Sequence, residues 1–144
     1  MSNAKRSVGL VAAICALVAP TTASAAKNHS VNITATLALV QAAPTRVAAG
    51  PLTGFGHDGL LITRSVITGT TFAGTLRAYN TAGSATARFT LVLTVAPDGS
   101  ATFTGTATVT GGTGRYQGAT GRLTIDGSAM GAVTTFHARG TLKY

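Results

Sequence analysis

The first candidates for chemistry are two adjacent residues, His57 and Asp58, in the sequence GFGHDG. A carboxylate beside an imidazole can tune a general base near neutral pH. Successive residues of an extended chain point to opposite sides, so an exposed polar loop is the alternative interpretation. The other two carboxylates, Asp98 and Asp126, each precede a glycine. Aspartate is favoured in such turns because its side chain bonds the local backbone.

Arg64 is the second candidate. In the run LLITRSVI it shares a strand face with the apolar residues Leu60, Ile62 and Val66. If this face lines a cavity, Arg64 could pair with Asp58 or orient an anionic guest. If the face is exterior, Arg64 is an ordinary surface charge. A slip of one residue in the strand would exchange the two faces.

Tyr116 is the third candidate, within the glycine-rich stretch GGTGRYQGATG of residues 111–121. It alternates with Arg115, and we expect the tyrosine to be the inward residue of the two. A tyrosine ring fills apolar space while its hydroxyl reaches a ligand or water, and a core tyrosine without a functional role is the alternative. We therefore predict Tyr116, Arg64, His57 and Asp58 as ligand-binding residues, and we name no catalytic residue.

Other chemistries find little support in the sequence. The three histidines, His29, His57 and His137, have no H-x-H or H-x-x-x-H spacing, so we predict no metal site. The only cysteine is Cys15, and no serine lies in a G-x-S-x-G elbow. We expect no cofactor.

The glycine-rich stretch also contains a G-x-G-x-x-x-G pattern, but a phosphate loop ends a strand and opens a helix. Here the β-type residues RLTIDGS follow. We therefore expect a hairpin instead of a nucleotide site. Gly111 and Gly112 would form its turn or a bulge, residues 115–117 would continue as strand, and Gly118 and Gly121 would lie where the sheet kinks.

The elements that must position these residues are predicted to be strands. From Leu60 onward, β-type runs alternate with turn residues at intervals of roughly ten. Pro97, Asp98 and Gly99 predict a hairpin closing between Val95 and Ala101. In ATFTGTATVT, residues 101–110, threonines occupy one face and mainly apolar residues the other, and residues 131–144 alternate similarly.

Towards the N-terminus we predict a first strand over residues 31–40. Residues 41–59 contain two prolines and four glycines without sustained periodicity, so we expect a long connection there. Seven or eight short strands predict an all-β fold. Small inward residues favour an antiparallel eight-stranded β-barrel, and an immunoglobulin-like β-sandwich is the alternative.

The first 25 residues have the layout of a signal peptide. Lys5 and Arg6 precede the apolar run VGLVAAICALVA, and Ala23 to Ala25 form an A-x-A cleavage site. We predict that residues 1–25 are removed on export and that residues 26–144 form one secreted domain without a thiol. A retained N-terminal anchor is the alternative, although the run is short for a membrane span.

The chain is strongly basic, with 11 lysines and arginines against 3 aspartates and no glutamate, and a net charge of +8. After the predicted signal peptide the basic residues are spaced singly along the chain, and aromatic residues are not interleaved with them. This distribution argues against a nucleic-acid partner. It favours solubility or weak attraction to an anionic cell envelope.

The stretch GGTGRYQGATG resembles the G-G-T-G-[KR]-[FY]-x-x-A-x-G segment of dirigent proteins, which share a barrel family with allene oxide cyclases. The matching positions are Gly111, Gly112, Thr113, Gly114, Arg115, Tyr116, Ala119 and Gly121. The resemblance implies an eight-stranded antiparallel barrel, often trimeric, whose apolar cavity shapes a guest without a cofactor. It also implies uncharacterised secreted bacterial relatives.

Two functional residues of that family have no counterpart here. Thr120 stands where dirigent proteins have an arginine important for activity, and the chain lacks the cavity glutamate of allene oxide cyclases. Our leading hypothesis is therefore a secreted barrel that binds a small, largely apolar ligand. A cofactor-free isomerase or cyclase and a non-catalytic cell-envelope protein are the alternatives.

Overall fold

The computed structural model describes residues 25–56 and 58–144 of the chain. The predicted signal peptide, apart from Ala25, lies outside the described residues, as does the candidate His57. No helix among the residues described has the length and apolar character needed to cross a membrane.

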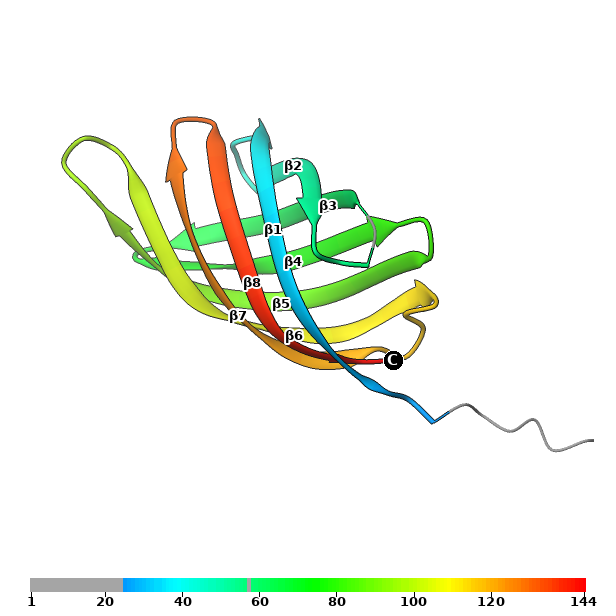
Figure 1. The fold of residues 1–144 in the computed structure, drawn as a ribbon. Helices are drawn as coiled ribbons and strands as arrows, with labels where there is room; N and C mark the ends of the chain where they lie inside the picture. Colours follow the sequence, from blue (N-terminus) through cyan, green and yellow to red (C-terminus); the bar gives the residue numbers. More distant parts are fainter. Residues whose placement is uncertain (1–24, 57) are drawn as a thin grey trace, which may run out of the picture.

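The chain folds into eight antiparallel strands that close into a barrel, with each strand beside its neighbours in sequence and β1 beside β8 (Figure 1). The strands are β1 (Asn28–Gln41), β2 (Arg46–Thr53), β3 (Gly59–Thr68), β4 (Thr71–Asn80), β5 (Gly83–Val95), β6 (Ala101–Gly114), β7 (Thr120–Met130) and β8 (Val133–Lys143). The predicted eight-stranded barrel is confirmed, and the fold is not the alternative immunoglobulin-like sandwich.

Alternating burial along the strands builds the core. In β6 the threonines at positions 102, 104, 106 and 108 are exposed, whereas Phe103, Ala107 and Val109 are buried. In β8 the residues Phe136, Ala138 and Leu142 are buried in the same alternation. The period of two predicted for both runs is confirmed, and the inward side chains fill much of the barrel.

The long connection predicted over residues 41–59 is wrong, because β2 lies within it. β2 pairs with β3 from Arg46–Ser65 to Leu52–Gly59 and with β1 on its other edge. Its sequence, RVAAGPLT, does not predict a strand, because alanine, glycine and proline are poor strand formers. Barrel closure nevertheless supplies a hydrogen-bonding partner on both sides, which outweighs the weak local preference.

The hairpin predicted for the glycine-rich stretch forms, with its turn later in the chain than expected. β6 continues to Gly114, and the turn occupies residues 115–118, for which the sequence in part predicts strand. The bulge expected near Gly111 is present, because the register with β5 shifts between Thr86 and Ala87. The turn falls where Gly114 and Gly118 take positive φ angles of 59° and 72°.

The turn predicted at Asp126 and Gly127 is also wrong, since both residues lie inside β7. A Cβ atom placed on Gly127 would lie 2.5 Å from Cζ of Phe103 and would also meet the carbonyl oxygen of Thr135. Glycine is therefore required here because the Phe103 ring packs directly on the strand backbone. From the sequence alone, an Asp-Gly pair whose glycine is required by packing cannot be distinguished from an Asp-Gly pair that forms a turn.

The hairpin predicted between Val95 and Ala101 is confirmed by their pairing at the ends of β5 and β6. In its turn, Asp98 Oδ1 accepts hydrogen bonds from the Ser100 hydroxyl at 2.6 Å and the Ser100 backbone N–H at 2.9 Å. The hydroxyl bond, followed by the backbone bond, lowers the pKa of Asp98 below its ordinary value of 3.8.

We expect an NMR titration of the Asp98 carboxyl to give a midpoint below 3.8, because the carboxylate is the form that accepts both bonds. The turn interaction is complete above the ordinary pKa and is lost as the pH falls through the lowered one. Ser100→Ala should move the midpoint upward, while Ser128→Ala should leave it unchanged. A midpoint insensitive to Ser100→Ala would contradict this assignment.

Candidate functional site

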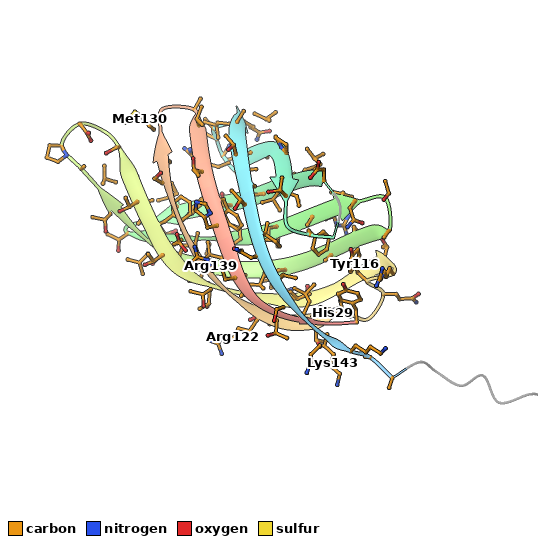
Figure 2. All side chains as sticks on the ribbon, viewed as in Figure 1. His29, Tyr116, Arg122, Met130, Arg139 and Lys143 are labelled. Atoms are coloured by element: carbon orange, nitrogen blue, oxygen red, sulfur yellow. The ribbon has the colours of Figure 1, made fainter. Side chains whose placement is uncertain are left out.

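The two ends of the barrel differ. At one end, which we call the closed end, the β6–β7 turn places Tyr116 over the core with 3% of its surface exposed. Its ring stacks on Phe55 at a centroid distance of 4.5 Å and meets the edge of Tyr144 at 4.9 Å. These rings pack together as an apolar plug. Figure 2 shows Tyr116 at the opposite end of the barrel from Met130.

Asn80 ties the plug to the surrounding loops. Its amide nitrogen donates to the Tyr116 hydroxyl at 2.7 Å and to the Phe55 carbonyl at 2.6 Å. Its amide oxygen accepts from the Ala82 backbone N–H at 2.8 Å. The Tyr116 hydroxyl is therefore engaged in a hydrogen bond that stabilises the closed end. This agrees with the alternative interpretation of Tyr116 as a core residue without a functional role.

The other candidates do not gather around Tyr116. Arg64 lies on the outer face of β3, exposed, while the neighbouring Thr63 and Ser65 face inward and are buried. It is therefore a surface residue, beside an outer groove that Arg77 also borders. Asp58 is exposed in the β2–β3 loop. His57 is outside the described residues, so its assignment as a ligand-binding residue stays a prediction.

A cavity opens at the other end, which we call the open end. It has a volume of about 240 Å³, and the β5–β6 and β7–β8 turns contribute Gly99 and Gly131 to its mouth. A narrower extension of about 30 Å³ adjoins it deeper in the barrel. Both parts are lined by Arg46, Phe72, Phe103 and Thr134.

The deeper part of the cavity is aromatic on several sides. Phe89 and Phe136 join Phe72 and Phe103 in its lining. The ring of Phe72 is tilted by 59° to those of Phe89 and Phe103, with centroids 5.4 Å and 6.2 Å away. Tilted rings at these distances present edges and faces against which an apolar guest can pack.

Two polar residues stand out in this apolar lining. Arg46, at the start of β2, pairs with Ser65 of β3 in the barrel register, so both belong to the inward face. Ser65 is 2% exposed. Its Oγ atom is buried and has no hydrogen-bond partner among the described residues. Nearby Thr63 differs, because its hydroxyl donates to the Ala48 carbonyl at 3.4 Å.

No aspartate is placed inside the barrel to neutralise Arg46. Asp58 belongs to the closed-end loop, and Asp98 is in the exposed β5–β6 turn. Asp126 lies on the outer face of β7, opposite His137 in the strand register with β8. Arginine is charged at all ordinary pH values. The open-end cavity therefore combines an apolar wall with one positive charge.

Exposed apolar side chains surround the mouth. Met130 and Val133 flank the β7–β8 turn with 68% and 50% of their surfaces exposed, and Val40, Ile67 and Val95 occupy the corresponding strand ends. We call these five residues the apolar rim. All five lie at the strand ends that meet at the open end, which gives this end of the barrel an apolar character.

The outer surface carries most of the remaining charge. Arg122 and Lys143 project away from the barrel in Figure 2. His137 also lies on the outer face, where its Nδ1 atom is 3.3 Å from the Thr34 hydroxyl oxygen. The His29 ring stacks on Tyr144 with a centroid distance of 4.2 Å. Within residues 25–56 and 58–144, no three His, Cys, Asp or Glu side chains come together as a metal site would require.

No family model, curated protein or solved structure matches this chain. Its function must therefore be inferred from its own residues.

Sequence reasoning missed Arg46 and Ser65. Arg46 was not considered because the segment that forms β2 was predicted to be a connection. Had it been predicted as a strand, the alternation Leu52, Gly50, Ala48, Arg46 would have placed Arg46 on the inward face. The signal for Ser65 was the other face of LLITRSVI, where Thr63 and Ser65 follow Leu61. A strand face with two hydroxyls resembles a surface face, so the pattern alone left the two faces of this strand undecided.

Proposed function

We propose that the protein is a secreted barrel that binds a small, largely apolar molecule in its open-end cavity. The observation that carries the proposal is the lining of this cavity by four phenylalanines, Phe72, Phe89, Phe103 and Phe136. A barrel of eight strands has room for one small ligand where its side chains do not fill it. The apolar rim offers such a molecule a favourable approach.

The size of the cavity limits the guest. At about 240 Å³ it is smaller than the pockets of roughly 300–1,000 Å³ that hold drug-sized ligands. The closed end cannot extend it, because the Tyr116 plug and a separate apolar gap of only about 20 Å³ lie there. We infer a guest of about one aromatic ring with a short substituent.

Binding accounts for the polar groups of the cavity better than catalysis does. An isomerase or cyclase of the allene oxide cyclase or dirigent type, to which the glycine-rich stretch bears its resemblance, would need groups that move protons. Arg46, Ser65 and Thr134 are suited to orienting a guest, and the three aspartates lie outside the described cavity. We therefore propose a binding protein.

Native mass spectrometry of the mature protein, recovered from the culture medium of its host, tests this proposal. We expect an additional small mass that Ala129→Trp removes, because Ala129 lines the mouth of the cavity. Ser128→Trp is the matched control, since Ser128 is exposed on the outer face of the same strand. A protein without a bound mass that also fails to bind toluene in an NMR titration would overturn the proposal.

A further inference from the structure

We propose that the open-end cavity recognises a small aromatic carboxylate, whose carboxylate is held by Arg46 and Ser65 and whose ring packs among the phenylalanines. The inference rests on the proposed function and adds the charge and polarity of the ligand. It depends on three observations: an arginine on the inward face, a buried hydroxyl without a partner among the described residues, and a cavity lined by phenylalanines.

The positive charge of Arg46 indicates that the ligand is an anion. Arg46 belongs to the inward face of β2 and lines both parts of the cavity. Arg46 is half-buried at the cavity mouth, and the described barrel interior provides no carboxylate to pair with it. An incoming carboxylate would supply the missing partner through charge-assisted hydrogen bonds.

The hydroxyl gives the position of the anion. Ser65 Oγ has less than 1 Å² of exposed surface and no hydrogen-bond partner in the described chain. Buried polar atoms are almost always satisfied, and Ser65 belongs to the lining of the deeper part of the cavity. We therefore infer that its side chain changes rotamer to donate to a ligand bound there. Ser65 lies opposite Arg46 in the register of β2 and β3, so the two side chains start from neighbouring positions on the inward face. We infer that one carboxylate accepts from both.

The shape and lining of the cavity indicate what is attached to the carboxylate of the ligand. The deeper part that Ser65 lines has about 30 Å³, enough for a small polar group. The adjoining 240 Å³ part leads to the mouth between the turns, with Phe72 and Phe103 along both parts. A carboxylate in the deep part would leave an attached ring in the wider part, in contact with aromatic edges and faces.

Two matched probes test the inference: cinnamate and its neutral amide, cinnamamide, titrated into the mature protein and followed by calorimetry and NMR. We expect cinnamate to bind about 10–100-fold more tightly, the range that corresponds to hydrogen bonds with a charged partner. Arg46→Met should reduce the affinity for cinnamate to that for cinnamamide and leave cinnamamide binding unchanged. Arg64→Met, on the outer face of the adjacent strand, should change neither.

Ser65→Ala separates a ligand contact from a structural role. Because its Oγ has no partner in the described protein, we expect removal of the hydroxyl to leave the melting temperature unchanged or raised, while the affinity for cinnamate falls severalfold. A hydroxyl that stabilises the barrel through its own bonds would give the opposite pattern, with a lower melting temperature and unchanged affinity.

The outcomes distinguish the inference from the proposed function. Equal affinities for cinnamate and cinnamamide, both abolished by Ala129→Trp, would overturn the carboxylate inference and leave the apolar-ligand proposal standing. Preference for cinnamate that is lost in Arg64→Met and kept in Arg46→Met would also overturn the inference, because it would place the anion on the outer face. Absence of binding by both probes and by toluene would overturn both.

Discussion

Replacing Tyr116 by alanine is expected to lower the free energy of unfolding by about 3–5 kcal/mol, the usual cost of truncating a buried aromatic side chain. The ring is almost fully buried, stacks on Phe55 and contacts the edge of Tyr144. Its removal would also leave Asn80 without one acceptor. Chemical denaturation monitored by circular dichroism measures the loss.

Two further variants divide this effect into parts. Tyr116→Phe keeps the ring and loses only the hydroxyl, and because Asn80 retains its bond to the Phe55 carbonyl we expect a cost of about 1 kcal/mol. Gln117→Ala, at an exposed position of the same turn, should have almost no effect. If Tyr116→Ala costs no more than Gln117→Ala, the plug does not stabilise the closed end.

Gly127→Ala is expected to destabilise the barrel by about 1–3 kcal/mol, the range for overpacking a core. The added methyl group would meet the Phe103 ring at 2.5 Å and the carbonyl oxygen of Thr135. Phe103 lines the open-end cavity, so a shift of its ring would change the shape of that cavity. We therefore expect the same variant to weaken the binding of apolar probes, measured by titration alongside thermal unfolding.

A double-mutant cycle isolates the contact with the ring. Phe103→Leu removes the aromatic edge, so Gly127→Ala should cost less in the Phe103→Leu background than in the wild-type protein. The backbone clash with Thr135 would remain and prevent complete rescue. Additive effects of the two substitutions would mean that Phe103 is not the reason for glycine at position 127.

The sequence predicted the barrel because much of its core follows a period of two. Residues 101–110 and 131–144 alternate so regularly that the order of their residue types is enough to assign their inward faces. Pro97 to Gly99 likewise specified a hairpin through local backbone chemistry alone. Features that depend on neighbouring residues in sequence were therefore predictable.

The missed features depend on partners that are distant in sequence. β2 exists because β1 and β3 pair with both of its edges, and Gly127 is required by a ring on β6. Tyr116 was predicted to point inward, which it does, but from a turn instead of a strand. The candidate site at Arg46 and Ser65 depends on the register of two strands, which local patterns do not specify.

The closure of the barrel between β1 and β8 has a consequence for how the chain folds. Every other pair of neighbouring strands is consecutive in the sequence, whereas β1 pairs with β8, the last strand of the chain. This pairing extends from Asn28–Lys143 to Ala38–Val133, so it cannot form until the end of the chain is available. Closing a loop of nearly the whole domain carries a large entropic cost and delays folding. A chain still being synthesised therefore has two open sheet edges, and these can pair with other chains until the final strand is released.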